Sequence, residues 1–543
     1  MKLVTVSQML AIEKEANAAG ITYEQMMENA GRGLAESVQE LEFKSGDFEV
    51  LGLVGPGNNG GDTLIALSLL AGAGWRAHAY LVKRSQDQLV ERLRKAGGQI
   101  LEQATDQEKS RLSSSISTCS VVLDGLLGTG TRPPLRGEVA ALMAEVNRLL
   151  DDLNTPPCVV AVDCPSGMDC DTGEVPEECI PADLTVTMAA VKQGLVSMPA
   201  YELAGDIRVV DIGLPSELPS LRAVRTEVAE EDLVASILPT RSPLAHKGTF
   251  GTALVTAGCP KYTGAALLAG AAAYRAGAGL VTLAVPPPVH AAIAGQLPEA
   301  TWILLPHELG VISRDAVGVL RKELASSTAM LVGPGLGLDQ TTADFVTSLL
   351  NCDGSLRQPA ATGFDSSAAQ MDRGAQSPLP PLVVDADGLK LLSRIPDWPR
   401  LLPAHTVLTP HPGEMSVLTG LAKDKIQADR SGIAGRYARD WGHIVVLKGA
   451  FTLIAAPDGR LCTIPVASAA LARAGSGDVL AGLVVGLLAQ GVAPYESALA
   501  AAWIHAMAGL AAARRLGNEA SVLAGDILRA VPEVIAELPR PSV

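Results

Sequence analysis

The stretch AGSGDVLAG, residues 474–482, combines a glycine-rich turn with an acid at the start of an apolar run. A glycine-rich turn that leads into a helix leaves backbone N–H groups unpaired at one point, where the helix dipole also favours an anion. The stretch therefore predicts a phosphate site. Asp478 falls in the first turn of the expected helix, so its carboxylate either caps the helix or accepts a proton from a substrate. Residues 474–482 alone leave both interpretations open.

A second polar turn, GPGNNGGD at residues 55–62, follows the apolar run 50–54 and precedes a run with helical periodicity. A strand, a tight turn and a helix are the first unit of a nucleotide-binding α/β layer. The turn is neither GxGxxG nor a Walker loop, since no Lys-Ser or Lys-Thr pair follows Gly61. A plain turn with capping polar residues is the alternative. The residues of this turn that can bind a ligand are Asn58, Asn59, Gly60, Gly61 and Asp62.

Two further acids come directly after apolar runs in the first half. Asp124 precedes GLLGTGTRPP (125–134), and Asp163 precedes CPSGMDCDTG (164–173). Ligands of open parallel sheets bind outside the carboxyl ends of the strands. We therefore expect these two loops and the turn at 55–62 to converge on one crevice.

The elements that position these residues alternate along both halves. Apolar runs at 50–54, 77–82, 121–123 and 159–162 are separated by segments with helical periodicity, which predicts a parallel sheet with helices on both faces. The same alternation resumes in the second half, with strands expected at 252–257, 280–285, 382–384, 407–409 and 443–447. We expect residues 351–378, which are rich in Ser, Ala, Gly and Gln, to form a mobile surface insertion.

Composition restricts the partners of the chain. A net charge of -15 over 543 residues argues against nonspecific nucleic-acid binding and against an anionic membrane surface. No apolar run is long enough to span a bilayer, and the amino terminus lacks a signal peptide. Eight scattered cysteines favour reduced thiols in a cytoplasmic protein. A homo-oligomer and a monomer both remain open.

Three motifs of the first half resemble the YjeF amino-terminal family, the NAD(P)H-hydrate epimerases. They are GNNGGD (57–62), DGLLGTG (124–130) and VDCPSGMDCDTG (162–173), and the likeness covers roughly residues 1–215. The resemblance implies a Rossmann-like three-layer α/β domain that binds the hydrated nicotinamide dinucleotide. Thr63 stands where the family commonly has Gly, and a threonine there can narrow the loop.

The resemblance also assigns roles to individual residues of the first half. It implies substrate contacts by Asn58, Asn59, Gly60, Gly61, Asp62, Gly128, Thr129, Gly130, Thr131, Arg132, Pro133, Pro134 and Asp163. It implies a potassium ion on Asn59, Asp124 and Ser166, whose oxygen atoms suit a hard cation. Asp163 is the candidate acid/base for epimerising the hydrated C6 centre. Lys192 of VKQGL is a weaker partner, and the sequence favours a surface lysine there.

Five motifs of the second half together resemble the ribokinase-like YjeF carboxyl-terminal family, the NAD(P)H-hydrate dehydratases. They are KGTFGTALVTAG (247–258), VGPGLG (332–337), TPHPGEM (409–415), VLKGAFT (446–452) and AGSGD (474–478). The likeness covers about residues 225–543 and implies a second three-layer α/β domain, with ADP rather than ATP as phosphate donor and with Mg²⁺. Ser476 replaces the usual threonine of the family and keeps its hydroxyl.

The second resemblance assigns a substrate site and a nucleotide site. It implies that Ala265, Gly335 or Gly337, His411 and Asp478 contact the hydrated dinucleotide. It implies that Lys448, Gly449, Ala450, Phe451, Thr452 and Gly477 contact the adenine nucleotide. Asp478 is then the expected base. His411 can be a general acid, a hydrogen-bond donor to the substrate or a structural residue, and we favour the binding role.

Together the two halves predict an α/β enzyme with an epimerase domain at 1–220 and an ADP-dependent dehydratase domain at 221–543, acting on NADHX and NADPHX. Phosphorylation makes the ring hydroxyl a leaving group, and loss of phosphate then restores the double bond. The alternative is a ribokinase-like small-molecule kinase, in which Asp478 activates a vitamin or sugar hydroxyl, fused to a non-catalytic nucleotide-binding module.

Overall fold

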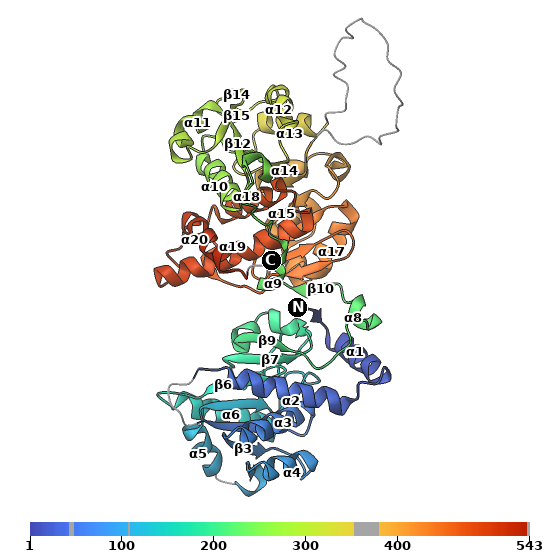
Figure 1. Cartoon of the computed structure of the whole chain (residues 1–543). Helices are drawn as coiled ribbons and strands as arrows, with labels where there is room; N and C mark the ends of the chain where they lie inside the picture. Colours follow the sequence, from blue (N-terminus) through green and yellow to red (C-terminus); the bar gives the residue numbers. More distant parts are fainter. Residues whose placement is uncertain (43–47, 107–108, 352–378, 540–543) are drawn as a thin grey trace, which may run out of the picture. The chain divides into compact units, whose positions relative to one another are not determined.

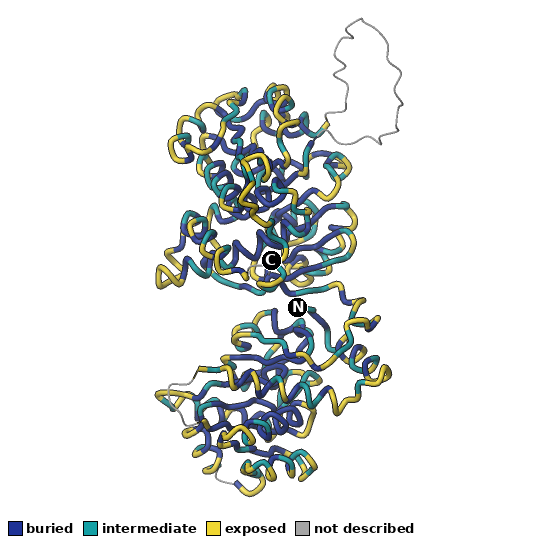
Figure 2. The backbone as a smooth tube through the Cα atoms, viewed as in Figure 1, coloured by how far each residue is buried: buried dark blue, intermediate teal, exposed yellow. Residues whose placement is uncertain are grey.

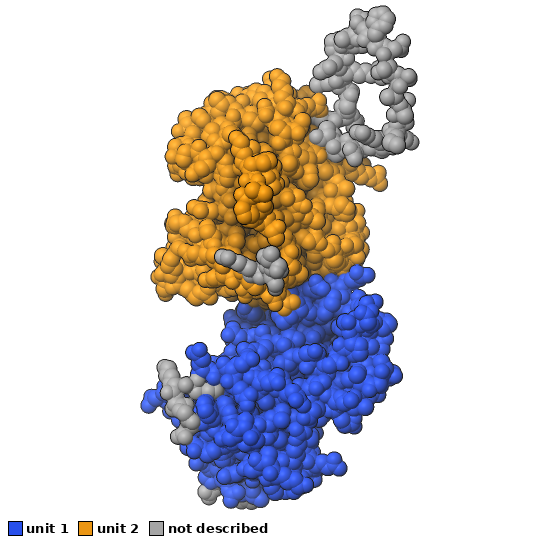
Figure 3. Space-filling model, in the orientation of Figure 1, with its two compact units in different colours: residues 1–228 blue, residues 229–543 orange. Residues whose placement is uncertain are grey.

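The structure, a computed structural model, describes residues 1–42, 48–106, 109–351 and 379–539. The chain divides into two compact units, Met1–Val228 and Ala229–Val543, shown in blue and orange in Figure 3. The predicted division after residue 220 falls inside the first unit. That predicted boundary lies within α8 (Pro219–Ala223), and β10 (Thr226–Val228) follows it. Residues 352–378 of the predicted insertion lie outside the described residues.

A parallel sheet forms the middle layer of the first unit, with the strand order β4-β3-β2-β5-β6-β7-β9 (Figure 1). Every neighbouring pair in it is parallel, as the sequence predicts. A short parallel pair, β1 with β8, lies outside this sheet. The strands are β1 (Leu3–Val4), β2 (Glu49–Val54), β3 (Arg76–Leu81), β4 (Gln99–Glu102), β5 (Val121–Gly125), β6 (Cys158–Val162), β7 (Leu184–Met188), β8 (Val191–Lys192) and β9 (Asp206–Val210).

Helices cover both faces of this sheet, because successive side chains of each strand enter different cores. Along β2, Val50 and Val54 pack with α1, α2 and α3, whereas Leu51 and Leu53 pack with α5 and α6. Thr5 and Thr22 begin α1 and α2 with capping boxes. The helices are α1 (Val6–Ala18), α2 (Tyr23–Gln39), α3 (Asn58–Gly72), α4 (Gln88–Lys95), α5 (Ser110–Thr118), α6 (Glu138–Asp151) and α7 (Tyr201–Ala204).

The strands of the second unit lie in the order β21-β20-β19-β18-β17-β16-β11-β12-β13. Pairs from β19 to β13 are parallel, and β20 and β21 add an antiparallel edge that the sequence did not predict. These strands are β11 (Thr252–Thr256), β12 (Leu280–Val285), β13 (Thr301–Leu304), β16 (Ala329–Val332), β17 (Leu382–Val384), β18 (Val407–Leu408), β19 (Ile444–Leu447), β20 (Leu453–Ala455) and β21 (Leu461–Thr463).

Small residues bring α10 (Thr263–Arg275) and α18 (Ser476–Ala489) close together on one face of this sheet. A Cβ atom added at Gly482 would lie 2.3 Å from the carbonyl oxygen of Ala269, and one at Gly486 would lie 2.6 Å from that of Ala273. Neither position has room for a side chain. The nearly wholly buried α18 therefore presents its amino terminus at a fixed place in the fold, which is where the AGSGD motif lies.

The remaining helices complete the layers around the second sheet, whose central strands are buried (Figure 2). They are α9 (Glu231–Ile237), α11 (Pro287–Ile293), α12 (Ala316–Leu324), α13 (Gln340–Leu350), α14 (Asp387–Leu392), α15 (Pro412–Thr419), α16 (Lys423–Ala428), α17 (Arg430–Trp441), α19 (Pro494–Leu516) and α20 (Ala524–Glu537). A hairpin of β14 (His307–Glu308) and β15 (Val311–Ile312) is separate from the sheet.

Both units therefore have the predicted three-layer α/β architecture. Within the described parts of the chain, no helix combines the length and the apolar character that a bilayer crossing demands.

Candidate active sites

Asn59 links the three loops that the sequence predicts to converge in the first unit. It lies in the first turn of α3, and its side-chain Nδ2 donates to the carbonyl oxygen of Leu127 at 3.2 Å and to that of Val162 at 2.5 Å. Leu127 belongs to the loop after β5, and Val162 ends β6. The predicted convergence is confirmed. Because Nδ2 makes both bonds, the Oδ1 atom of Asn59 stays available as an acceptor.

Two glycines beside Asn59, Gly60 in the first turn of α3 and Gly128 in the loop after β5, have no room for a side chain. A Cβ atom at Gly60 would lie 2.1 Å from the carbonyl oxygen of Gly55, and one at Gly128 would lie 2.8 Å from Asn59 Oδ1. Arg84, which the sequence analysis missed, supports the turn before α3, because its Nη1 donates to the carbonyl oxygens of Gly55 at 3.0 Å and Gly57 at 3.1 Å. No local motif marks Arg84, so the sequence carried no signal for it.

Asp124 and Ser166 form a fully buried pair between the second and third loops. The Asp124 carboxylate accepts from Ser166 Oγ at 2.6 Å and from the Ser166 N–H at 2.8 Å. Burial raises the pKa of Asp124, and the two bonds from Ser166 oppose that rise. None of the ion pairs among the described residues includes Asp124. A buried carboxylate without a basic partner is a plausible cation ligand.

Asp163 and Lys192 form a buried ion pair, which corrects the expectation of a surface lysine at Lys192. The Lys192 side chain is 1% exposed, and its Nζ donates to Asp163 Oδ1, to Thr187 Oγ1 at 3.0 Å and to the Met188 carbonyl oxygen at 2.9 Å. Asp163 Oδ1 also accepts from the Met188 N–H at 2.9 Å. The backbone of Asp163 is left-handed, with φ 67°, which is costly for a residue other than glycine. The fold holds this carboxylate against the lysine.

Two more acids lie within electrostatic range of this pair. Burial raises the pKa of Asp62 well above its usual value, and Asp163 and Glu13 raise it further, against Lys192. Burial also raises the pKa of Glu13. Glu13 comes from α1 and was not predicted. The site thus contains one lysine among three acids, an arrangement suited to holding and moving a proton.

Thr63 does not narrow the loop, contrary to the expectation from its departure from the family pattern. Its side chain is fully buried, and its Oγ1 donates to the carbonyl oxygen of Asn59 at 2.7 Å. A Cβ atom at Gly125 would lie 2.0 Å from that Oγ1, so Thr63 fills space against β5 rather than the loop. In the loop after β5, Arg132 pairs with Asp169 at 3.6 Å. The substrate contacts predicted for Asn58, Thr129, Gly130, Thr131, Arg132, Pro133 and Pro134 stay predictions.

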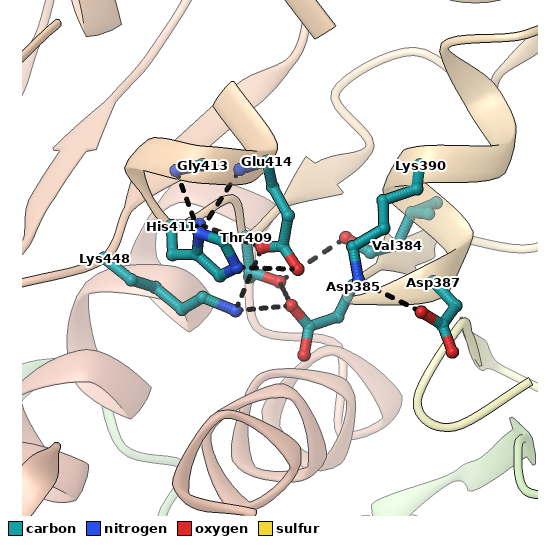
Figure 4. A network of polar contacts seen from close by, with 9 residues as sticks. All are labelled: Val384, Asp385, Asp387, Lys390, Thr409, His411, Gly413, Glu414 and Lys448. Atoms are coloured by element: carbon teal, nitrogen blue, oxygen red, sulfur yellow. Dashed lines mark hydrogen bonds and ion pairs between the residues drawn. The ribbon is translucent and has the colours of Figure 1, made fainter. Parts of the chain in front are cut away.

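The second unit gathers charged side chains at the carboxyl ends of three neighbouring strands (Figure 4). Asp385 follows β17, Thr409 follows β18 and Lys448 follows β19. Asp385 Oδ1 accepts from Lys448 Nζ and from Thr409 Oγ1, each at 2.7 Å. Glu414 lies 3.7 Å from Lys448 Nζ. Burial disfavours the charge on Lys448, but Asp385 and Glu414 outweigh it and raise the pKa of Lys448.

The sequence analysis missed Asp385, Thr409 and Glu414 as site residues. Thr409 and Glu414 lie in the TPHPGEM motif, and Asp385 directly follows the strand expected at 382–384, where an acid is a signal that points to a site. Glu414 is buried, and burial raises its pKa against the opposing effect of Lys448.

His411 caps α15, which defines the chemistry that its ring can perform. Its Nδ1 accepts from the Gly413 N–H at 2.9 Å and from the Glu414 N–H at 3.2 Å, so that nitrogen carries no proton. Burial and the nearby Lys448 lower the pKa of His411. Its Nε2 remains as the N–H donor, 3.4 Å from Glu414 Oε1, on a side chain that is half exposed. A general-acid role is therefore disfavoured, and a role as hydrogen-bond donor is retained.

Asp478 lies in the first turn of α18 but does not cap it. The N-cap residue is Gly475, with φ 88°, and no side chain makes the cap hydrogen bond. A Cβ atom at Gly477 would lie 3.4 Å from Lys448 Nζ and 3.8 Å from Asp385 Oδ2, so the lysine and the acid stand at the amino terminus of the helix. Burial, with a contribution from Asp385 against Lys448, raises the pKa of Asp478 to about 7. Of the two interpretations left open by the sequence, the structure favours the proton acceptor.

The VGPGLG loop lies against α10 and α14. A Cβ atom at Gly335, where φ is 61°, would lie 2.7 Å from the Cβ of Tyr262 and 2.9 Å from that of Ala265. The Gly337 N–H donates to Asp387 Oδ2 at 3.0 Å, and Asp387 Oδ1 accepts from Lys390 Nζ at 3.1 Å. Ala265 and Gly335 are thus neighbours. Whether Gly335 or Gly337 contacts the substrate stays open.

The KGAFT turn leaves β19 in an unusual backbone conformation. Gly449 has φ 140° and Phe451 has φ 53°. The Phe451 N–H donates to the carbonyl oxygen of Val466 at 3.0 Å, and Thr452 Oγ1 donates to that of Gly449 at 3.0 Å. Gly449 and Ala450 are exposed, so the turn presents backbone groups at the surface beside Lys448. The nucleotide contacts predicted for Lys448, Gly449, Ala450, Phe451, Thr452 and Gly477 stay predictions.

The donor sets of the two sites suit different cations. Asn59, Asp124 and Ser166 offer neutral and carboxylate oxygens, which fit a hard cation such as K⁺. Asp385 and Glu414 offer two carboxylates, and Mg²⁺ is commonly bound by one or two carboxylates together with substrate phosphates. Among the described residues, no group of three or more His, Cys, Asp and Glu side chains forms a metal site. The potassium and magnesium sites thus stay predictions.

Fold and site together define a two-part α/β enzyme, one part with a buried lysine–acid cluster and the other with an acid of raised pKa beside a lysine at a helix amino terminus. The NAD(P)H-hydrate dehydratase family model matches residues 253–360 and 361–533, and the model of the YjeF-related protein N-terminus matches residues 23–194. The chain belongs to the family of bifunctional NAD(P)H-hydrate repair enzymes.

Relatives of this family match the chain from end to end. The bifunctional NAD(P)H-hydrate repair enzyme of Moorella thermoacetica is 36% identical over 99% of this chain and 97% of its own length. That of Salinibacter ruber is 36% identical over 94% and 92%. A solved ADP/ATP-dependent NAD(P)H-hydrate dehydratase from Bacillus subtilis, co-crystallised with ATP/Mg²⁺, is 28% identical, with a TM-score of 0.47, over 58% of this chain and 100% of its own.

Proposed function

We propose that this enzyme repairs hydrated nicotinamide cofactors. One activity interconverts the R and S forms of NADHX and NADPHX, and the other dehydrates the S form to NADH or NADPH with ADP as phosphate donor. The observation that carries the proposal is the end-to-end match to relatives named as bifunctional repair enzymes, in a chain that contains both a lysine–acid site and a phosphate-type site. The small-molecule kinase alternative is not favoured, because these relatives match both halves.

The dehydratase chemistry is assigned to the second unit. Asp478 takes the proton of the ring hydroxyl as that oxygen attacks the terminal phosphorus of ADP, and AMP leaves. The lone pair of the ring nitrogen then breaks the C6–O bond, so the ester leaves as inorganic phosphate, and loss of a proton from C5 to the phosphate or to water restores the C5–C6 double bond. With a pKa of about 7, Asp478 is half deprotonated near neutral pH and is a suitable general base.

The groups around Asp478 support the charge that develops on the transferring phosphoryl group. The N–H groups of Ser476 and Gly477 open α18, where the helix dipole favours an anion. Lys448 stands beside Gly477. Preorganised donors of this kind commonly supply the largest part of a rate enhancement. Asp385 and Glu414 are the carboxylates that would hold Mg²⁺, which neutralises phosphate charge when bound.

The epimerase chemistry is assigned to the first unit. Asp163 acts as the acid/base at the hydrated C6 centre, and Lys192 holds the Asp163 carboxylate in place and stabilises its charge. Asp62, whose pKa burial raises well above its usual value, can hold a proton nearby. Asn59, Asp124 and Ser166 would hold K⁺, which supplies positive charge beside an anionic dinucleotide.

Further parts of the proposal concern contacts, partners and location. The hydrated dinucleotide contacts the loops at 57–62 and 128–134 in one site, and Ala265, Gly335 or Gly337, and His411 in the other. The two activities divide between the units 1–228 and 229–543. The partners are small molecules, and the location is cytoplasmic.

The experiment that tests the proposal mixes the full-length protein with chemically hydrated NADH and either ADP or ATP. We expect recovery of reduced-nicotinamide absorbance with ADP, stoichiometric release of AMP and phosphate, and consumption of both epimers. Accumulation of a stable phosphorylated product would instead indicate a kinase. If one epimer is consumed rapidly and the other only at the rate of spontaneous interconversion, the protein has no epimerase activity.

A further inference from the structure

A half-buried arginine supports the KGAFT turn from the side of α17. Arg430 is the first residue of that helix, and its Nη2 donates to the carbonyl oxygen of Leu447 at 3.1 Å and to that of Lys448 at 3.4 Å. Its Nη1 donates to Gln427 Oε1 at 2.9 Å. Three of the five N–H donors of the guanidinium are thereby used, which leaves two for a ligand.

The guanidinium lies directly against Gly449. A Cβ atom at Gly449 would lie 3.0 Å from Nη1 and 3.3 Å from Nη2 of Arg430. The φ of 140° at Gly449 already requires glycine, and the arginine removes the remaining space for a side chain. A ligand that approaches the exposed backbone of this turn therefore meets the guanidinium at close range.

The charge of Arg430 has no negative counterpart in the described part of the chain. Its recorded partners are two carbonyl oxygens and one amide oxygen, and it takes part in none of the ion pairs there. Burial lowers the pKa of Arg430. Arg436, on the same helix, is 65% exposed and pairs with Asp440 at 3.4 Å. Arg430 is partly exposed and has no acidic partner among the described residues, so its charge is available to an anionic ligand.

Lys448 already has negative partners within the protein, before a nucleotide binds at this turn. Its Nζ already contacts Asp385 at 2.7 Å and Glu414 at 3.7 Å, so one positive charge faces two carboxylates. ADP brings further negative charge to the same place. Arg430 is the uncompensated cation beside the turn, and a guanidinium matches the geometry of phosphate oxygens.

We propose that Arg430 binds the phosphate groups of the nucleotide through the remaining N–H of Nη1, which faces Gly449, while the N–H groups of Nη2 hold the turn. This inference rests on the proposed function, which places ADP at the KGAFT turn, and it adds a binding residue from α17 to that site.

Isothermal titration of the full-length protein with ADP, and separately with adenosine, tests the inference. Arg430→Gln is compared with the natural protein and with Arg436→Gln, the matched control on α17. We expect Arg430→Gln to weaken ADP binding roughly ten- to a hundredfold, the loss expected for charged hydrogen bonds, and to leave adenosine binding unchanged. Arg436→Gln should change neither. If Arg430→Gln does not fold, Arg430→Lys is tested in its place. Lysine keeps the positive charge but lacks the paired N–H donors of the guanidinium, so ADP affinity should fall to a smaller extent and adenosine affinity should be kept.

Two outcomes would overturn the inference. Equal losses for ADP and adenosine would show that Arg430 only supports the turn. Unchanged ADP affinity in Arg430→Gln would show that it does not touch phosphate, and the proposed function would stand. Failure of the natural protein to bind ADP would overturn the proposed function itself, and the inference with it.

Discussion

Lys448 Nζ lies 2.7 Å from Asp385 Oδ1, although the two residues are 63 positions apart in the sequence. The sheet explains the contact. Val384 pairs with Leu408 and Leu408 pairs with Val445 in parallel register, so β17, β18 and β19 end side by side and the first residues after them meet. Thr409, from the middle strand, donates to the same carboxylate oxygen. Three local motifs become one site because parallel strands place their carboxyl ends at one edge.

Asp478→Asn should abolish dehydration and leave epimerisation intact. The amide cannot take a proton, so the rate of ADP-dependent recovery of NADH from S-NADHX should fall roughly a hundred- to ten-thousandfold. Asp440→Asn, an exposed acid on α17, is the matched control and should keep full activity. Absorbance at the reduced-nicotinamide band measures the dehydration, and chromatography of the two epimers measures the other activity. Full recovery in Asp478→Asn would show that the base lies elsewhere.

The dehydration rate should decline on the acid side of neutral pH. Burial and Asp385 raise the pKa of Asp478 to about 7, and the base must be deprotonated to act. The deprotonated fraction of a group with that pKa falls about tenfold between pH 8 and pH 6. We therefore expect kcat to fall by about tenfold over that range. The measurement is a pH profile at saturating ADP and substrate. A flat profile from pH 6 to 8 would contradict the assignment.

Local patterns were enough to predict the architecture. Apolar runs marked the parallel strands, and turns rich in Gly and Asn marked the loops after them, because both signals depend on neighbouring residues. Lys192 was considered as a weaker partner of Asp163, but its burial was not expected, because it depends on how the chain turns after β7. Arg84 and Arg430 were missed for the same reason, since each contacts a glycine turn from a different element. Asp385 and Glu414 carried a readable signal, as acids that follow strands.

Potassium should stimulate epimerisation and not dehydration. Asp124 is buried with the hydroxyl and N–H of Ser166 as its partners, and Ser166→Ala removes the hydroxyl from this set of oxygens. We expect the K⁺ concentration for half-maximal epimerisation to rise roughly tenfold in Ser166→Ala, in line with the loss of one charged hydrogen bond. Ser68→Ala, which removes a buried hydroxyl that bonds the Leu64 carbonyl oxygen within α3, is the control. Equal rates in K⁺ and in choline would rule out the site.

Gly335→Ala should impair dehydration far more than an alanine elsewhere in the same unit. The new methyl group would lie 2.7 Å from the Cβ of Tyr262 and 2.9 Å from that of Ala265, at a left-handed φ of 61°. The loop or α10 must shift, and we expect the KM for S-NADHX to rise at least about tenfold, because small displacements in a site are costly. Gly435→Ala is the control. It lies within α17 with its nearest neighbour at 3.8 Å, so it should stabilise the protein by up to about 1 kcal/mol. A normal KM in Gly335→Ala would remove this loop from the substrate site.

Lys192→Met should destabilise the first unit and abolish epimerisation, and the double variant should separate these two effects. Removing the lysine leaves the buried Asp163 carboxylate unpaired, which costs about 3–5 kcal/mol. In Asp163→Asn/Lys192→Met no charge remains buried, so most of that stability should return, while epimerisation stays absent. Arg94→Met, which breaks an exposed pair with Glu91, should cost less than about 1 kcal/mol. Urea unfolding of the natural protein, these three variants and Asp163→Asn, all full length and read by probes in each unit, measures the cycle. A double variant no more stable than Lys192→Met would show that the ion pair is not what holds Lys192 in the core. A double variant that still epimerises the substrate would show that neither residue is the acid/base.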